Sequence, residues 1–212
     1  MKKKINCLIS VGPTREWLDS VRFFSNPSSG KMGYALADEA HKRGFQVTLV
    51  SGPVNLDINN EINLKRVETA EEMRREMVNY FKNASLIIMC AAVCDHRPKV
   101  QWRKKKKKEE LPLKIEIEMT PDILKELGNK KKDSQKLVGF AAETENGEEY
   151  AKSKLITKNL DWIALNDVSK KSIGFGSDFN EITLFSSSGK KVNLTQASKK
   201  EIATQFFETI LK

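Results

Sequence analysis

Three apolar runs limit the possible folds more than any other feature of the sequence. They are INCLISV (5–11), QVTLVSG (46–52) and LIIMCAAV (86–93), which are rich in Ile, Val and Leu and lack polar alternation. Parallel strands that are covered on both faces have this pattern. The two intervening segments, 30–44 and 69–81, carry apolar residues at helical spacing. Strands that alternate with helices predict an α/β fold.

The next part of the chain continues this alternation. Residues 111–119 alternate apolar with charged side chains, which predicts an edge or one-sided strand. A short helix follows, with Pro121 in its first turn. Residues 136–143 and 161–168 predict two further buried strands, and a helix from about 148 to 158 joins them.

The C-terminal residues predict a β-hairpin over 181–195 and an amphipathic helix over 198–212. A length of 212 residues fits one domain. We therefore expect a single domain, residues 1–212, with a mostly parallel sheet of Rossmann-like or ribokinase-like form. Helices cover both faces of this sheet, and the hairpin and last helix complete it.

The composition indicates a cytoplasmic protein that does not enter a membrane. No apolar run approaches the roughly 20 residues that a membrane helix needs. The N-terminal MKKKINCLISVG has basic residues before a short apolar run but lacks a small-residue cleavage site. Cys7, Cys90 and Cys94 are an odd number of cysteines in a chain without an export signal, so we expect reduced thiols.

The positive charge is concentrated in one segment. The net charge is +9, and Arg103 to Lys108 supplies six of these charges, which leaves +3 for the rest of the chain. Nucleic acids are usually bound by a broad basic surface, whereas a single lysine cluster can bind one triphosphate or remain solvated. A nucleic-acid-binding module that uses the lysine run is therefore a minor alternative, because only Trp102 provides an aromatic ring beside it.

Ligands of open α/β sheets bind beyond the carboxyl ends of the strands, so we expect functional residues in the segments that follow each buried strand. After the first strand, Gly12 begins a tight exit, and Ser28, Ser29 and Gly30 precede a helix. Backbone N–H groups at a helix start favour an anion such as phosphate. An ordinary Ser N-cap is the alternative. Neither a P-loop nor a G-x-G-x-x-G motif is present, which disfavours a dinucleotide-dependent oxidoreductase, the second functional alternative.

Other strand ends also carry charged residues. Asp95 precedes the lysine run, and an acid beside many cations suggests a nucleotide triphosphate with magnesium; the alternative is a solvated loop. Cys90, Cys94 and His96 have no zinc-site spacing, so we expect no metal ligands of the protein there. Lys154 and Lys158 fall on one helix face and repel each other unless an anion or solvent separates them.

The motifs together resemble phosphopantothenate–cysteine ligase, also called phosphopantothenoylcysteine synthetase. They are GPTREWLDSVRFFSNPSSGKMGYALADEAHKRGFQVTLVSGPV, AAVCDHRP, TPDIL, GFAAET with the following KSKLITK, and NDVS, and they run nearly end to end. In many bacteria this domain follows a flavin-dependent decarboxylase domain. The chain begins at the ligase strand, so it resembles a stand-alone ligase with a separate decarboxylase as a partner.

The resemblance implies a reaction in coenzyme A biosynthesis. A nucleoside triphosphate, with Mg²⁺, activates the carboxylate of 4′-phosphopantothenate as an acyl-nucleotide, and L-cysteine then forms the amide. CTP is favoured over ATP by the GFAAET motif and the compact length. The family also implies a homodimer, whose contact the 181–195 hairpin or the 111–119 strand could supply because exposed edge strands pair readily.

The resemblance also assigns roles to residues. It implies that Asn26, Arg22 and Lys105 are catalytic, and that the Asn26 amide donates to a developing oxyanion while its oxygen accepts. The lysine register is ambiguous within Lys104 to Lys108. Substrate phosphate is expected at Ser28, Ser29 and Gly30. The nucleotide-binding positions are Gly12, Ala91, Ala92, Asp95, Lys105, Pro121, Asp122, Ile123, Leu124, Phe140, Lys154 and Lys158.

Some positions depart from the family pattern. Ser20 stands where proline is frequent, and Pro27 follows Asn26 where histidine is frequent. Cys94-Asp95-His96 replaces the usual Ala-Asp-Tyr. These departures bear on how the substrate is positioned and leave the implied mechanism intact.

Overall fold

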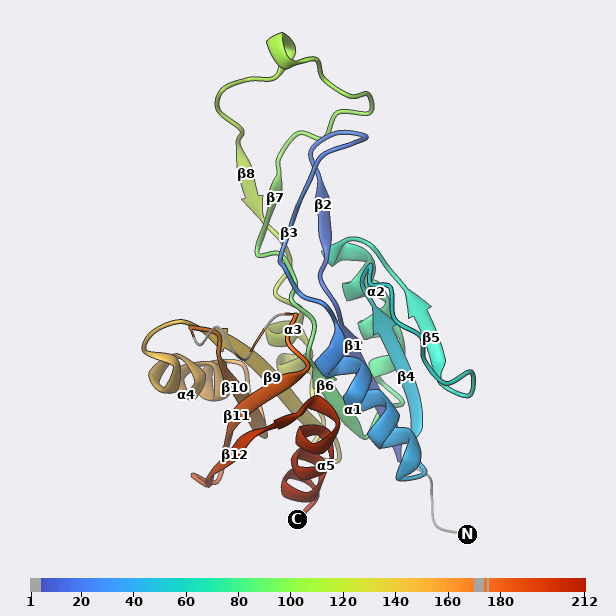
Figure 1. Ribbon diagram of the computed structural model, residues 1–212, viewed down its shortest axis with the longest axis vertical. Helices are drawn as coiled ribbons and strands as arrows, with labels where there is room; N and C mark the ends of the chain where they lie inside the picture. The colour runs from blue at the N-terminus through green and yellow to red at the C-terminus, as the bar shows by residue number, and fades with distance from the viewer. Residues whose placement is uncertain (1–4, 170–173, 175) are drawn as a thin grey trace.

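A twisted eight-stranded sheet with helices on both faces forms the body of the molecule, and a long arm rises from one end of it (Figure 1). The computed structural model describes residues 5–169, 174 and 176–212. The basic start of the N-terminal segment, residues 2–4, lies outside the described residues. Within the described part, every helix is too short or too polar to pass through a lipid bilayer.

Six neighbouring strands of the sheet are parallel, and they have the strand order of the Rossmann fold. In spatial order they are β5 (Asn63–Arg66), β4 (Gln46–Ser51), β1 (Asn6–Val11), β6 (Leu86–Met89), β9 (Lys136–Glu143) and β10 (Trp162–Asp167). The antiparallel strands β11 (Phe179–Ser186) and β12 (Lys191–Ser198) extend the β10 edge. The predicted mostly parallel sheet and C-terminal hairpin are confirmed. The sequence analysis missed β5, which is short and polar.

Two apolar layers separate the sheet from its helices. On one face, α1 (Lys31–Lys42) and α5 (Lys199–Ile210) pack on the sheet, with Leu36 and Phe206 fully buried. On the other face lie α2 (Ala70–Phe81), α3 (Ile123–Lys130) and α4 (Gly147–Thr157), which contribute Met73 and Leu127. Strand residues alternate between these two layers, which is why the apolar runs are continuous.

The helix starts follow the sequence signals in most cases. The Thr69 side chain accepts from the backbone N–H of Glu72, whose carboxylate accepts from the Thr69 N–H, so α2 has the expected capping box. Asp122 is the N-cap of α3 and accepts from the Lys125 N–H. Pro121 precedes this cap, so its predicted place in the first turn is wrong by two positions.

Four short strands form the arm, which we define as residues 15–25 and 96–119. The hairpin of β2 (Arg15–Trp17) and β3 (Phe23–Ser25) lies beside the hairpin of β7 (His96–Pro98) and β8 (Ile117–Met119) (Figure 1). A 3₁₀ turn, η1 (Lys108–Glu110), stands at the outer end. The predicted strand 111–119 is therefore a strand only in its last three residues.

The side chains of β8 face opposite to the expectation. Ile117 and Met119 are 52% and 78% exposed, whereas Glu118 between them is partly covered and pairs with Arg97 at 2.8 Å. The sequence pattern predicted a buried apolar side, but among the described residues no further layer lies behind this two-stranded sheet to bury these side chains.

Gly33 sets how closely α1 approaches β1. A Cβ atom at this position would lie 2.3 Å from Val11 Cγ1 and 2.7 Å from Val11 Cβ. Both distances are far inside van der Waals contact. The first turn of α1 therefore rests directly on the last residue of β1, and this contact places the N-terminus of α1 at the carboxyl edge of the sheet.

We predict that Gly33→Ala destabilises the protein by about 1–3 kcal/mol, because the added methyl group overpacks the contact with Val11. Urea unfolding followed by circular dichroism measures this. Lys42→Ala, at an exposed position of the same helix, is the matched control and should change the free energy of unfolding by less than about 0.5 kcal/mol. A Gly33→Ala variant as stable as the control would contradict the close packing.

Candidate active site

A cavity of about 690 Å³ opens at the carboxyl ends of β1, β6 and β9. The strand order reverses between β1 and β6, which is where Rossmann-like sheets bind ligands. The cavity brings together most of the positions expected from the sequence, namely Asn26, Ser28, Ser29, Gly30, Ala91, Ala92, Asp95, Pro121, Asp122, Ile123, Leu124, Phe140, Lys154 and Lys158. Segments more than 120 residues apart in the chain thus share one site.

Asn26 is fixed by the backbone that follows β6. Its Nδ2 donates to the carbonyl oxygens of Ala92 and Val93, each at 3.1 Å. An amide nitrogen has two hydrogens, so these two bonds use both donors. The expectation that this amide donates to a developing oxyanion is therefore not met in the observed geometry, and Oδ1 is the Asn26 atom available for a substrate donor.

The segment Ser28 to Gly30 leads into the N-terminus of α1 at the cavity wall. Gly30 is the N-cap residue and has a positive φ of 74°, which favours glycine. No described side chain caps this helix, so the alternative of an ordinary Ser N-cap is wrong. The Gly30 N–H points to Ser28 Oγ at 3.4 Å. The first-turn N–H groups and the positive end of the helix dipole suit an anion.

Lys154 and Lys158 both line the cavity, and each pairs with a carboxylate. Lys154 Nζ lies 2.6 Å from Glu143 Oε1, and Lys158 Nζ lies 2.9 Å from Asp122 Oδ2. These acids relieve the expected repulsion between the two lysines, so a bound anion is not needed for that purpose. An anionic ligand at this end of the cavity would compete with two carboxylates for the ammonium groups.

Phe140 lies inside β9, whose bounds match the strand predicted over 136–143. The Phe140 ring packs on Phe206 with 5.6 Å between ring centroids. Its exposed part offers an aromatic surface on the cavity wall. Asp95 is exposed at the cavity mouth, and its backbone carbonyl accepts from the Thr120 N–H.

The thiols near the cavity are not reactive groups. Burial raises the pKa of Cys90 to about 12, although nearby Lys199 opposes this effect, and burial also raises the pKa of Cys94. Both are therefore neutral at physiological pH. Across the described residues, no three His, Cys, Asp or Glu side chains gather closely enough to hold a metal ion by themselves.

Three expected site residues do not line this cavity: Gly12, Arg22 and Lys105. Gly12, at the exit of β1, accepts a hydrogen bond from the Ala92 N–H through its carbonyl. Arg22 and Lys105 belong to the outer part of the arm, where Arg22 pairs with Asp19 at 2.6 Å. Of the three residues that the resemblance implies are catalytic, only Asn26 therefore lines the cavity within one chain.

Several polar residues of the cavity wall were not expected from the sequence, among them Lys199 and Asn166. Lys199, the first residue of α5, is 6% exposed and donates to the carbonyl oxygens of Gly174 and Ser177. Burial, together with Lys31, lowers its pKa. Asn166 Oδ1 is buried without a hydrogen-bond partner in the described structure. The position of Asn166 after a buried strand was an available signal, whereas Lys199 resembles any exposed lysine in a first helical turn.

The comparisons with known proteins agree with one another. The DFP family model, described as DNA/pantothenate metabolism flavoprotein C-terminal domain, matches residues 2–212. The Coenzyme A biosynthesis bifunctional protein CoaBC of Bacillus subtilis is 45% identical over 204 residues, which are 96% of this chain and 50% of that protein. The chain spans about half the length of the curated relatives it matches.

Solved structures share the fold. The crystal structure of the C-terminal domain of a CoaBC protein superposes with a TM-score of 0.82 at 41% identity, covering 97% of this chain and 93% of that one. A Cab2 mutant in complex with phosphopantothenate-cysteine superposes with a TM-score of 0.73 at 17% identity, covering 96% and 85% of the two chains. The second likeness concerns the fold alone.

An ion pair between two helices supports the rim of the cavity. Arg74 of α2 donates to Glu126 of α3 through Nε at 2.6 Å and Nη2 at 3.1 Å. α3 carries the rim residues Ile123 and Leu124, so this pair fixes them against the body. The Arg74 hydrogen bond, and then that of Lys130, lowers the pKa of Glu126 from its ordinary value of 4.5.

We predict that Glu126→Gln lowers the urea midpoint at pH 7 and that this difference disappears in acid. The folded pKa lies below the unfolded one, so the carboxylate stabilises the fold above about pH 4.5 and loses its contribution as pH falls through the folded pKa. Unfolding curves at pH 7 and near pH 3 test this. Glu149→Gln, an exposed position on α4, is the control. A gap between wild type and Glu126→Gln that persists unchanged in acid would refute the prediction.

Proposed function

Because this chain belongs to the DFP family, the DNA/pantothenate metabolism flavoprotein C-terminal domain, we propose that it is a phosphopantothenate–cysteine ligase. The relative from Bacillus subtilis is named for coenzyme A biosynthesis, and the fold is shared with a protein solved in complex with phosphopantothenate-cysteine. The proposed substrates are 4′-phosphopantothenate, L-cysteine and a nucleoside triphosphate. The proposed unit of function is the domain of residues 1–212.

The proposed reaction has two steps. A carboxylate oxygen of 4′-phosphopantothenate attacks the α-phosphorus of the nucleotide, and pyrophosphate leaves. The amino group of cysteine then attacks the acyl carbon, the amide forms, and the nucleoside monophosphate leaves. The first step is needed because a carboxylate oxygen is a poor leaving group, whereas a phosphate ester oxygen is a good one.

One observation carries the proposal: a single cavity joins Asn26, an uncapped helix N-terminus and a rim of lysines. Asn26 is held rigidly by two carbonyl groups, as a residue that orients an intermediate must be. The N-terminus of α1 can bind a phosphate through its free N–H groups, and the ammonium groups of Lys154 and Lys158 lie at the other wall of the cavity. The cavity is large enough for an acid and a nucleotide together.

CTP is the proposed nucleotide, with ATP as the competitor. Mg²⁺ commonly binds through one or two carboxylates together with substrate phosphates. Asp95 at the cavity mouth fits that pattern, since a lone carboxylate can complete a site that a triphosphate supplies. When bound, the ion would offset charge on the phosphates, and Asp95 would orient it.

The distant position of Arg22 and Lys105 fits a homodimer. The arm exposes Ile117 and Met119, and a second copy covering this face would bury apolar surface and bring one arm toward the partner's cavity. Arg22 and Lys105 could then act in that cavity. The proposed product carries a cysteine carboxylate, so a flavin-dependent decarboxylase is the proposed next enzyme, as a separate protein or a fused domain.

We predict that the protein releases pyrophosphate when given 4′-phosphopantothenate, Mg²⁺ and a nucleotide, faster with CTP than with ATP. Asn26→Asp should retain pyrophosphate release yet lose most amide formation, since a carboxylate cannot donate to Ala92 and Val93 and cannot keep the same orientation. A loss of about 10²-fold in amide formation is expected. Enzyme-coupled pyrophosphate detection and mass spectrometry of the amide measure the two steps.

Asn193→Asp, at an exposed position of β12, is the matched control and should behave like wild type in both steps. Absence of pyrophosphate release with either nucleotide would reject the ligase proposal. An Asn26→Asp variant that forms the amide at the wild-type rate would remove Asn26 from the mechanism while leaving the activity standing.

We predict that the arm forms the dimer contact. Met119→Lys places a charge on the exposed apolar face of β8 and should convert a dimer to a monomer in size-exclusion chromatography with light scattering. Thr195→Lys, at an exposed site of the edge strand β12, should leave the dimer intact. The reverse result would assign the contact to the C-terminal hairpin, and a monomeric wild type would reject the dimer.

A further inference from the structure

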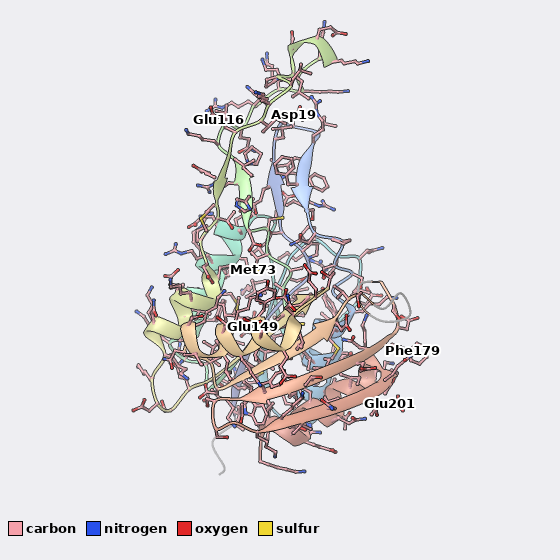
Figure 2. All side chains as sticks on the ribbon, turned by 90° about the vertical axis from the view of Figure 1, so that its left-hand side faces the viewer. Asp19, Met73, Glu116, Glu149, Phe179 and Glu201 are labelled. Carbon is pink, nitrogen blue, oxygen red and sulfur yellow. The ribbon has the colours of Figure 1, made fainter. Side chains whose placement is uncertain are left out.

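Asp19 lies in the turn between β2 and β3 near the outer end of the arm, far from the sheet (Figure 2). Its side chain has no exposed surface, although the surrounding arm is largely exposed. A fully covered carboxylate must be compensated by hydrogen bonds or counter-charges, because burial penalises its charged form. The groups that donate hydrogen bonds to the Asp19 carboxylate therefore indicate its role.

Both oxygens of Asp19 accept several hydrogen bonds. Oδ1 accepts from the backbone N–H groups of Val21 and Arg22, each at 2.9 Å. Oδ2 accepts from Arg22 Nε at 2.9 Å and Nη2 at 2.6 Å, and from the backbone N–H of Lys106 at 3.3 Å. Burial alone would raise the pKa of Asp19, but these donors, with the Arg22 side chain first, hold it well below its usual range.

The last of these bonds crosses between the two hairpins of the arm. Lys106 is 87 residues further along the chain, in the lysine run. Arg22 completes the link, since its Nη2 also donates to the Lys106 carbonyl oxygen at 2.7 Å. The two peptide groups on either side of Lys106 are therefore held from one side by a carboxylate and from the other by the guanidinium that this carboxylate orients.

Neighbouring contacts make the same connection. The Trp102 N–H donates to the Leu18 carbonyl at 3.0 Å, and Lys106 Nζ lies 5.9 Å from the centre of the Trp102 ring. Lys106 is half-buried by these contacts, whereas Lys105 beside it is exposed. The start of the lysine run is thus ordered by its backbone, which leaves the Lys105 side chain free of the clamp and facing solvent.

We propose that Asp19 is a positioning residue that locks Arg22 and the backbone of Lys106 into one unit, so that the guanidinium and the Lys105 ammonium meet an anionic substrate at a fixed separation. The proposal rests on the ligase function proposed above, and it assigns a role in that reaction to a residue that touches no reacting atom. Without the carboxylate, the Arg22 guanidinium would lie beside the lysine run with no counter-charge, and both cations would have to be ordered anew at each turnover.

Asp19→Asn tests the proposal. The amide keeps the shape of the side chain but loses the charge, and if its Oδ1 contacts persist, its NH₂ group meets the donors of Arg22 and Lys106. Hydrogen exchange of the segment 102–108, followed by mass spectrometry, should become roughly ten- to a hundredfold faster. This readout needs no substrate and reports on the clamp itself.

Kinetic measurements distinguish a positioning role of Asp19 from a general loss of folded structure. In the active enzyme, Asp19→Asn should lower kcat for pyrophosphate release and for amide formation, each by roughly 10- to 100-fold, because the lysine run and Arg22 are displaced together. Arg22→Lys keeps the charge but loses the forked contact with Asp19 and Lys106. The double variant should be no worse than the poorer single variant, since the two residues act as one unit.

Glu116→Gln is the matched control on the same arm (Figure 2), because Glu116 is an exposed carboxylate that pairs only loosely with Lys99 at 3.3 Å. It should match wild type in both readouts. Unchanged exchange in Asp19→Asn would overturn the clamp. Faster exchange with wild-type kinetics, or additive losses in the double variant, would overturn the positioning role alone. An inactive wild type with either nucleotide would reject the ligase function, and the exchange result would still decide the clamp.

Discussion

The backbone carbonyls of Ala92 and Val93 are the point on which the cavity depends. β1 and β6 pair in parallel, and this pairing continues beyond the strands through a bridge between Pro13 and Ala92. Asn26 then donates to both carbonyls. The connections after β1 and β6 leave toward opposite faces of the sheet, so a crevice opens between these two strands. The Asn26 side chain lies at the edge of this crevice. The exit of β6 and the root of the arm meet at this junction.

The charges around the cavity are largely balanced before any ligand arrives. Lys154 and Lys158 are paired with Glu143 and Asp122, and Asp122 also caps α3. To contact Lys154 and Lys158, the phosphates of the proposed nucleotide would have to displace these carboxylates. The affinity for the nucleotide would then depend on how much stronger the lysine–phosphate contacts are than the lysine–carboxylate pairs. The two ion pairs hold the lysine side chains in place at the cavity wall.

The body and the arm are stabilised by different forces. The body has two continuous apolar layers, with Phe206, Phe207 and Leu36 fully buried on one side. The arm has two short two-stranded sheets that hold together through polar contacts such as Asp19 with Arg22 and Arg97 with Glu118. A two-stranded sheet is marginal by itself in water. Ile117 and Met119 are exposed, so they contribute little apolar burial to the arm.

The sequence by itself determined the parts that depend on local pattern. Continuous apolar runs specified the buried parallel strands, and Thr69 and Glu72 specified the start of α2. Most positions that the motif resemblance indicated line the cavity. These signals work because burial on both faces and helix capping depend on residues close in the chain. Strand β5 (Asn63–Arg66) lacked such a signal, because it is short and Leu64 is its only apolar residue.

Only the tertiary structure decided which side chains of the arm are exposed and which distant residues they contact. The pattern of 111–119 predicted a buried side, yet the part of the chain that the structure describes leaves Ile117 exposed. The Arg22 guanidinium donates to the Lys106 carbonyl on the arm, and the Asn26 amide donates to the carbonyl oxygens of Ala92 and Val93. The physical reason is that these contacts join residues 66 to 87 positions apart. Hydrogen bonds at that separation are fixed by how the layers stack, which no local periodicity encodes.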